Sequence, residues 1–407
     1  MVKTLERSVE PSDALNIIRR ELINMGLEYE LTTMGAPDSI QTYRCTLLDM
    51  SHKELAVGNG KGLGPQSEAS AVFEALEHLF VAFPPQSGIQ EIPIGDLLGR
   101  GEVLQDPALQ IIKQWHPSTR LDCRVYQSLR DGTEVFYPLF LAAPGCGIPP
   151  VARSVLAPAA KYSTNNGTAT GLGKTEALIH AISEVVERDS LSCFLLQTFV
   201  ARHPKPVRVI GRHSLPLGLV NLMVDAEEII GASIQLLDIT TELQIPSILA
   251  VGGNGYGVSF VGSGASLSKS YAIERALLET VQSFHLSTAA LREEDASFLR
   301  LFSKLPRYQS CIRLDLTHCP TVTVSYNDVV SYGLPENLEN HLSQLIQRVE
   351  GCGYPIFFHH VHASELGVDC VHCIVPGLEK FHLVRSGQPV LPSSRGAAKI
   401  DELRLAK

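Results

Sequence analysis

Three stretches of the chain follow one pattern, and this pattern constrains the fold more than any other feature. Each stretch begins with a Gly-rich segment, continues through Ser, Thr or Ala residues, and ends in a helical run with polar residues spaced three apart. The stretches are "GKGLGPQSEASAVFEALEH" (60–78), "ATGLGKTEALIHAISEVVER" (169–188) and "GSGASLSKSYAIERALLETVQ" (262–282). The recurrence predicts three similar helices within one architecture.

The polar residues that are three apart predict a shared site. Residues at this spacing lie on one face of a helix, so each pair can point at a single target. Magnesium prefers carboxylate and phosphate oxygens, and helix N-termini after Gly-rich segments attract anions. Such pairs also occur on solvated helix faces, but the apolar residues between them favour a joint Mg-nucleotide pocket. The pairs are Glu74 with Glu77, Glu184 with Glu187, and Glu279 with Gln282.

The "GLGKT" segment (171–175) invites comparison with a phosphate-binding P-loop. That loop needs Gly, four residues, and then Gly-Lys-Ser/Thr. Counting back from Gly173, the first position is Thr168, and the nearest glycine, Gly167, is one residue too far. The preceding run, 151–166, is also a poor candidate for a buried strand. We therefore assign the chemistry to "EVVERD" (184–189) rather than to Lys174.

Composition and charge narrow the class of protein. Apolar residues make up 44% of the chain and charged residues 19%, which is typical of a globular protein with a sizeable core. The net charge of −9 and the lack of a Lys/Arg block argue against nucleic-acid binding. The N-terminus has no signal-peptide pattern, and no apolar run reaches the ~18 residues of a membrane span, so we expect a cytoplasmic protein.

Hydrophobic periodicity predicts an α+β fold with mostly antiparallel strands and no flexible linker between halves. Besides the three helices above, helices are expected over 11–25, 107–115, 216–230 and 335–350. Strands are expected over 28–32, 41–57, 233–239, 246–251, 321–325, 354–361 and 370–375, with a hairpin turn at Asp131 and Gly132.

The nine cysteines show no framework spacing, so we expect reduced and mostly buried thiols. Cys370 and Cys373 lie in a predicted strand and should face opposite ways, which argues against a zinc site. Cys193 lies in an apolar helical run and is interpreted as a core thiol rather than a nucleophile.

At the motif level, "NGTATGLGKTEALIHAISEVVERD" (166–189) resembles the signature of the YcaO family. "GKGLGPQSEASAVFEALEH" resembles the first ATP motif of that family, "IERALLETVQS" (273–283) its Arg-Ala-x-x-Glu-x-x-Gln motif, and "HCIVPGLEKF" (372–381) its late Val-Pro-Gly-Leu-Glu segment. The motifs occur in the family's order and span roughly residues 55–395.

The resemblance implies which residues bind the cofactors, and it assigns no further catalytic residue. The implied Mg²⁺ ligands are Glu74, Glu77, Glu184 and Glu187. The residues implied to hold ATP are Lys61, Ser70, Glu176, Arg188, Arg275, Glu279 and Gln282.

The resemblance also implies an activity and an architecture. Family members use ATP to activate a peptide-backbone amide and form azolines, thioamides or amidines, so we expect an enzyme acting on a ribosomally synthesised precursor peptide. The implied fold is two related halves of antiparallel sheet and helix around an ATP cleft, divided here as 1–54, the core 55–395, and the tail 396–407. We further expect a separate peptide-engaging or sulfur-donating partner and a homodimer.

Two departures from the family pattern keep other functions open. His78 stands where the first motif usually has Arg, and the tail "AAKIDELRLAK" is not Pro-rich. The alternatives are a non-catalytic scaffold that binds a leader peptide or partner, and an accessory factor for ribosomal-protein methylthiolation.

Overall fold

The computed structural model describes residues 6–98, 101–146, 153–255, 257–333 and 335–401. Within these ranges, no helix is long and apolar enough to cross a membrane. The last six residues of the predicted tail, 402–407, lie outside the described residues, and the part before them forms the end of helix α13 (Ser394–Asp401).

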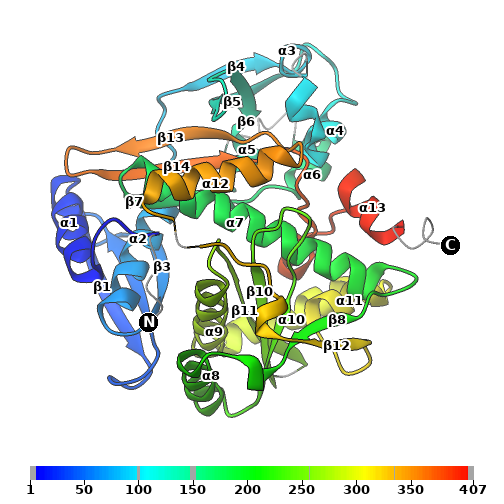
Figure 1. Cartoon of the computed structure of the whole chain (residues 1–407). Coiled ribbons are helices and arrows are strands. Elements are labelled where there is room, and N and C mark those ends of the chain that lie inside the picture. Colours follow the sequence, from blue (N-terminus) through cyan, green and yellow to red (C-terminus); the bar gives the residue numbers. More distant parts are fainter. Residues whose placement is uncertain (1–5, 99–100, 147–152, 256, 334, 402–407) are drawn as a thin grey trace.

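Three sheets form the framework, and Figure 1 shows them around the long central helix α7. The first sheet has the order β1-β2-β3, and the second has the order β11-β10-β9-β8-β12. The third has the order β4-β5-β13-β14-β7, with β6 paired to β5. All pairings are antiparallel except that of β8 with β12. The α+β class predicted from the sequence is confirmed.

The strands are β1 (Glu28–Met34), β2 (Gln41–Leu48), β3 (Glu54–Gly62), β4 (Ile89–Pro93), β5 (Arg120–Ser128), β6 (Glu134–Pro138), β7 (Thr168–Leu172), β8 (Val207–Ile210), β9 (Ile234–Asp238), β10 (Ser247–Gly255), β11 (Val258–Ala265), β12 (Thr321–Val324), β13 (Phe357–Ala363) and β14 (Val368–Ile374). The α-helices before β8 are α1 (Pro11–Asn24), α2 (Pro65–Ala82), α3 (Ile94–Leu97), α4 (Pro107–Ile112), α5 (Leu139–Ala142), α6 (Arg153–Ala160) and α7 (Lys174–Leu195). Those after it are α8 (Leu217–Ile230), α9 (Lys269–His285), α10 (Ala289–Leu301), α11 (Pro306–Arg313), α12 (Leu338–Gly351) and α13.

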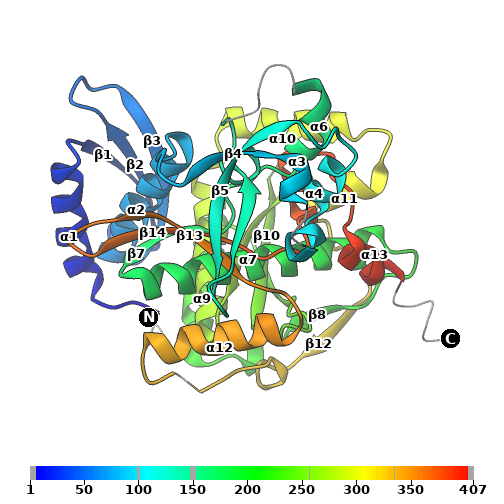
Figure 2. The same cartoon turned by 90° about the horizontal axis from the view of Figure 1, so that it is seen from above.

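The three look-alike stretches each form a strand followed by a helix that packs back onto it. They are β3 with α2, β7 with α7, and β11 with α9. Each strand lies in a different sheet, so the repeated unit places one helix against each sheet. The three units contact one another through β3 with α9, β7 with α2, and β11 with α7, and Figure 2 shows α2 beside β7, towards the left of the view.

The Gly-rich segments differ from the prediction that they are helix N-termini for anions. Most of their glycines lie inside strands, where a Cβ on Gly60 would be 2.0 Å from Ser67 O and one on Gly262 would be 2.2 Å from Ala276 O. Glycine is therefore required because the helix backbone lies directly on the strand backbone. The repeated pattern encodes close strand–helix packing.

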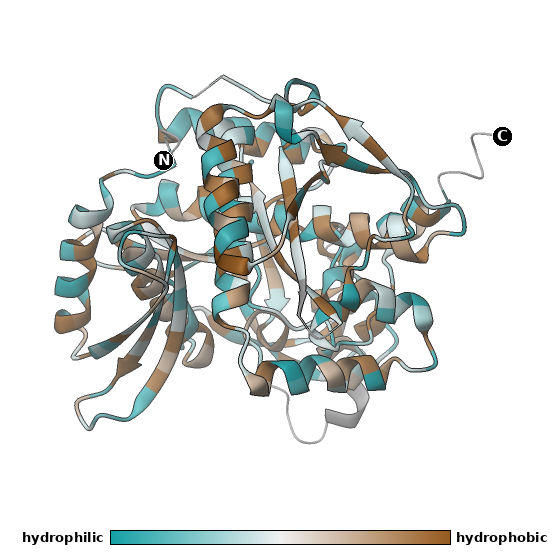
Figure 3. Cartoon of the chain, turned by 90° about the horizontal axis from the view of Figure 1, so that it is seen from below, coloured by the Kyte–Doolittle hydropathy of each residue, from teal (hydrophilic) through white to brown (hydrophobic). Residues whose placement is uncertain are grey.

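Side-chain alternation explains how each sheet joins two cores. On β10, Ile248 and Ala250 pack with α8 and α9, whereas Leu249 and Val251 face the opposite cluster. Helices carry alternating hydrophilic and hydrophobic bands in Figure 3, as expected of elements with one face on a sheet. The predicted strand alternation at β14 is confirmed, because Cys370 and Cys373 lie in different hydrophobic clusters.

Most predicted elements are present. The elements that were not predicted are helices α3, α5, α6, α10, α11 and α13 and strands β4, β8 and β11, and β7 forms a strand directly before α7, where none was expected. That strand passes into the helix through Gly173 alone, so there is no loop of P-loop length. All nine cysteines are free, and Cys193 is buried, with burial raising the pKa of its thiol well above its ordinary value.

Candidate active site

Glu187 lies at the meeting point of the three repeated units. Its side chain is 2% exposed on α7. Ser263 on β11 donates a hydrogen bond of 2.7 Å to Oε1. Arg275 Nη2 on α9 lies 3.6 Å from Oε2, and Arg188 Nη1 lies 3.7 Å from Oε1. Oε2 is buried and has no hydrogen-bond partner among the described residues. Arg275 therefore lies beside Oε2 without a hydrogen bond, and the hydrogen-bonding capacity of this oxygen is unused.

Strand β7 and the glycine directly before it, Gly167, hold two further carboxylates through backbone N–H groups. The N–H of Gly167 donates to Glu184 Oε2 at 3.2 Å, and the N–H of Thr170 donates to Glu77 Oε1 at 2.6 Å. Burial raises the pKa of Glu77 well above its ordinary value, with the charges of Glu74 and Glu184 adding to the effect. Burial also raises the pKa of Glu184 to about 7, and Glu187 contributes to that rise. The four implied Mg²⁺ ligands thus influence one another through space.

The third helix brings a carboxylate that is neutralised by cations. Lys61 Nζ on β3 lies 2.7 Å from Glu279 Oε2 on α9. Burial would raise the pKa of Glu279, but the charges of Lys61 and Arg188 outweigh it, and the pKa is lowered. Gln282, one turn further along α9, donates to the carbonyl of Asn59 and so fixes α9 against β3.

On α2, Ser70 and His78 make fewer contacts with the other two helices. Ser70 is partly buried one turn before Glu74. His78 Nε2 lies 4.0 Å from Glu74 Oε1, while His78 Nδ1 is 2.5 Å from the carbonyl of Val57. His78, which stands where the family motif usually has Arg, therefore contacts both its own helix and β3.

Glu176 is held by residues that the sequence analysis did not select. Its Oε1 is 3.1 Å from Arg7 Nη1, and its Oε2 accepts the Ser8 N–H at 2.8 Å. The Arg7 charge also lowers the pKa of the nearby His180, after the larger effect of burial, and opposes the rise in the pKa of Glu77. Arg7 precedes the first helix in a non-periodic segment, so its sequence gives no signal of this role.

Lys174 does not belong to this cluster. Its Nζ lies 4.2 Å from the centroid of the Phe358 ring on β13, and it lines a different surface pocket together with His359 and His360. The prediction that Lys174 is not a P-loop lysine agrees with this position.

The four glutamates supply the oxygen donors that a divalent cation needs, although they do not form a closed set of ligands. Among the described residues, no three His, Cys, Asp or Glu side chains form a closed metal-ligating group. Carboxylates of like charge repel one another unless a cation lies between them. The unused hydrogen-bonding capacity of Glu187 Oε2 and the raised pKa of Glu77 and Glu184 show that the negative charge is only partly compensated. An oxygen-preferring ion such as Mg²⁺ fits this donor set.

Comparison with known proteins gives a family match over most of the chain. Residues 59–379 match the family described as YcaO cyclodehydratase, binding ATP and Mg²⁺. An uncharacterised protein of Methanothermobacter thermautotrophicus is 26% identical over 228 residues, which span 54% of this chain and 56% of that protein.

Solved structures share the fold at low sequence identity. YcaO from Methanopyrus kandleri, bound with AMPPCP and Mg²⁺, has a TM-score of 0.67 at 21% identity, covering 96% of this chain and 98% of that one. A heterocyclase in complex with substrate and cofactor has a TM-score of 0.69 at 18% identity, covering 93% of this chain but only 54% of that one. The Escherichia coli microcin synthetase McbBCD complex matches with a TM-score of 0.57 at 15% identity, over 86% of this chain and 88% of that one.

These matches agree with the order of the motifs and with the convergence of α2, α7 and α9. The chain belongs to the YcaO family of ATP- and Mg²⁺-binding cyclodehydratases.

Proposed function

We propose that this chain uses ATP to phosphorylate a backbone amide oxygen of a ribosomally synthesised precursor peptide. The amide oxygen forms a bond to the γ-phosphorus while the bond to ADP breaks. A neighbouring Cys, Ser or Thr side chain, or a sulfide supplied by a partner, then attacks the amide carbon, and phosphate leaves with the former amide oxygen. The product is an azoline after attack by the side chain, or a thioamide after attack by sulfide.

The proposed site consists of carboxylates for Mg²⁺ and cationic side chains for phosphate. Glu74, Glu77, Glu184 and Glu187 would hold Mg²⁺, which neutralises charge on the phosphate oxygens when bound. Arg188 and Arg275 present forked guanidinium groups beside Glu187, which suits them to phosphate oxygens. Lys61 adds a third cation beside Glu279.

On the N-terminal side, the structure adds Arg7 to this proposal. Its guanidinium bridges to Glu176 yet remains about half exposed, at 47%. It can therefore reach a nucleotide phosphate without losing a core contact. Ser70 and Gln282 remain proposed nucleotide contacts on α2 and α9.

The observation that carries the proposal is the partly compensated carboxylate at Glu187. A buried acid with an oxygen that accepts no hydrogen bond costs free energy unless a cation or donor completes it, and Arg275 at 3.6 Å from Glu187 Oε2 does so only in part. A scaffold that never bound a cation would have no reason to retain this cost beside two further buried glutamates. This favours an enzyme over the scaffold and accessory-factor alternatives.

The test combines purified protein with Mg²⁺, ATP and a Cys/Ser/Thr-rich precursor peptide, with and without candidate partner proteins. We expect peptide-dependent release of ADP and phosphate, and a peptide mass that falls by one water or changes by exchange of oxygen for sulfur. Titration calorimetry with AMPPCP and Mg²⁺ should show binding by the wild type. Absence of nucleotide binding, or full activity of the Glu187→Ala variant, would contradict the proposal.

The biological setting is part of the same proposal. A separate peptide-engaging or sulfur-donating partner, a homodimer, a cytoplasmic location and the division into 1–54, 55–395 and 396–407 are predictions. Gel filtration with light scattering, alone and with the partner, measures the dimer. The mass of the modified peptide distinguishes azoline from thioamide.

A further inference from the structure

One peptide bond in the site is held from both sides. The carbonyl of Asn166 lies 3.2 Å from His372 Nε2 on β14. The N–H of the same peptide unit, which belongs to Gly167, donates to Glu184 Oε2 at 3.2 Å. A buried histidine and a proposed Mg²⁺ ligand are therefore connected through a single rigid peptide plane.

Gly167 has little freedom to move this peptide elsewhere. Its φ is +89°, and an added Cβ would lie 2.3 Å from Cys373 O and 2.9 Å from Val185 Cγ2. The carbonyl of Gly167 also accepts the N–H of Cys373 at 2.8 Å. The orientation of the peptide plane is thus set by its contacts with β14, including His372.

His372 is itself oriented by Tyr126. The Tyr126 hydroxyl lies 2.5 Å from His372 Nδ1, and both side chains are almost completely buried, at 0% and 2% exposure. Burial, followed by the charge of Arg124, lowers the pKa of His372 to about 3, so the ring is neutral. A neutral ring that accepts the Tyr126 hydroxyl proton at Nδ1 must carry its own proton at Nε2. Nε2–H can then donate to Asn166 O.

We propose that the Tyr126–His372 pair positions the Glu184 carboxylate, through the Asn166–Gly167 peptide, and thereby sets the affinity of the site for a divalent cation. His372 is a positioning residue in this inference, which rests on the proposed role of Glu184 as a ligand. Residues that hold metal ligands in place commonly contribute a factor of about 10 to 100 in metal affinity. The contrasting interpretation is a core histidine that contributes only to stability.

The test measures Mn²⁺ binding, in place of Mg²⁺, by electron paramagnetic resonance of the free ion in the presence of AMPPCP. His372→Ala removes the donor to Asn166 O, and we expect the Kd for Mn²⁺ to rise about 10- to 100-fold. His372→Gln places an amide N–H donor near the position of Nε2, so it should restore affinity to within about threefold of the wild type. Tyr126→Phe removes the hydroxyl that keeps the proton of His372 on Nε2. The rise in the Kd for Mn²⁺ should therefore lie between those of His372→Gln and His372→Ala.

His359 provides the matched control. It lies on neighbouring β13, its ring centroid is 5.8 Å from that of Tyr126, and its Nδ1 is 2.9 Å from the carbonyl of Val125, but within the described chain no hydrogen bond joins it to His372, Asn166 or Glu184. Burial lowers its pKa to about 4, so it is also a neutral histidine, although it is only partly buried. His359→Ala should leave the Kd for Mn²⁺ unchanged, with a smaller loss of stability than His372→Ala.

Thermal unfolding and circular dichroism of each variant separate a loss of fold from a loss of affinity. A His372→Ala variant that is folded and binds Mn²⁺ like the wild type overturns the positioning role. A His372→Ala variant that is unfolded leaves the decision to His372→Gln and Tyr126→Phe, which must then differ in affinity as stated. If Glu187→Gln also retains Mn²⁺ binding, the proposed function fails instead, because the site is then not a metal site.

Discussion

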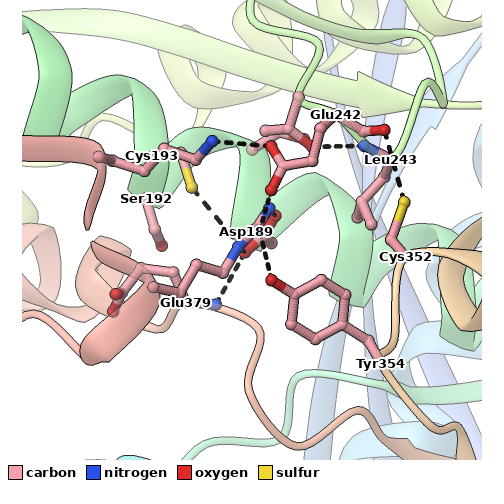
Figure 4. A network of polar contacts seen from close by, with 12 residues as sticks. Asp189, Ser192, Cys193, Glu242, Leu243, Cys352, Tyr354 and Glu379 are labelled. Carbon is pink, nitrogen blue, oxygen red and sulfur yellow. Dashed lines mark hydrogen bonds and ion pairs between the residues drawn. The ribbon is translucent and has the colours of Figure 1, made fainter. Parts of the chain in front are cut away.

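Helix α7 carries two groups of buried carboxylates that differ in how completely they are compensated. The charge of Glu187 adds to the rise in the pKa of Glu184, and Oε2 of Glu187 has no hydrogen-bond partner among the described residues. Asp189 lies two residues after Glu187 and is 0% exposed, yet every part of its carboxylate is engaged. Figure 4 shows Asp189 at the centre of a network that joins α7 to the C-terminal region.

The contacts of Asp189 are complete. Arg395 on α13 donates through Nε to Oδ1 and through Nη2 to Oδ2, each at 2.8 Å. The N–H of Glu379 donates to Oδ1 at 2.8 Å. Arg395 reaches further to Tyr354, at 2.7 Å, and to Glu242. This carboxylate is structural, because both of its oxygens already accept hydrogen bonds from donors on distant segments.

The comparison shows that burial of an acid does not by itself indicate function. A buried acid that is fully paired stabilises a junction between segments, whereas one that is partly paired beside other acids is ready to receive a cation. The two groups on α7 can be separated by experiments that remove one and preserve the other.

The largest expected effect is on stability, from Arg395→Ala. Removing one partner of a buried ion pair leaves an uncompensated charge and costs about 3–5 kcal/mol. Urea unfolding should show this decrease, while the folded variant keeps its affinity for Mn²⁺. Lys399→Ala, which removes a cation from the partly exposed Glu242, is the control and should cost less than about 1 kcal/mol. A cost below about 1 kcal/mol for Arg395→Ala would contradict a structural role for the Asp189 network.

The second effect is on catalysis, from Glu187→Gln. The amide can still accept from Ser263 but cannot supply the charge that a cation requires. We expect Mg²⁺-dependent ATP turnover to fall about 100-fold or more, with a smaller change in stability than for Arg395→Ala. Turnover close to that of the wild type, or a stability loss as large as that of Arg395→Ala, would remove the distinction between the two groups.

A third effect concerns Arg7, at the edge of the proposed site. Arg7→Ala should raise the KM for ATP about tenfold, equivalent to about 1.4 kcal/mol, because one charged phosphate contact is lost. The melting temperature should fall less than for Arg395→Ala, because Arg7 is 47% exposed and the buried Glu176 keeps the hydrogen bond from the Ser8 N–H. Arg20→Ala, an exposed arginine on α1, is the matched control and should leave KM unchanged. An unchanged KM for Arg7→Ala would place Arg7 outside the nucleotide pocket.

The smallest effect is the pH dependence of the structural network. Burial would raise the pKa of Glu242, but Lys399 and Arg395 outweigh it and lower the pKa to about 2. A lowered folded-state pKa contributes stability that is present above the unfolded value of about 4.5 and is lost as the pH falls from there through about 2. Glu242 is 43% exposed, so the contribution after screening is below about 1 kcal/mol. Acid unfolding of Glu242→Gln should be less steep over this window than that of the wild type, and identical curves would contradict the assignment.

Much of the fold could be predicted from local patterns. Hydrophobic periodicity located α1, α2, α7, α8 and α12, because apolar residues recur at helical spacing in these segments. Strand β11 was missed because its glycines and serines were interpreted as the beginning of α9. In the part of the chain that the structure describes, helix α10 has no buried residue, and α11 is short, with only Cys311 and Ile312 buried, so neither stood out from a polar segment.

The candidate site could be predicted only in part. Pairs spaced three apart indicated the glutamates of α2 and α7, since spacing along a helix is a local property. Arg7, the Tyr126–His372 pair and the Asp189–Arg395 pair gave no such indication. Arg395 lies far from Asp189 in the chain, and only folding brings the end of the described chain against α7.

The sequence by itself determined the family, the α+β class and the helices that present paired carboxylates, because motifs and periodicity are written in neighbouring residues. Only the tertiary structure decided which buried acids are compensated. Compensation depends on cations and backbone N–H groups that come from distant segments, such as Arg395 for Asp189 and the backbone of β7 for Glu77 and Glu184. It also decided the meaning of the glycines, because close contact between a strand and a helix exists only after the two have packed.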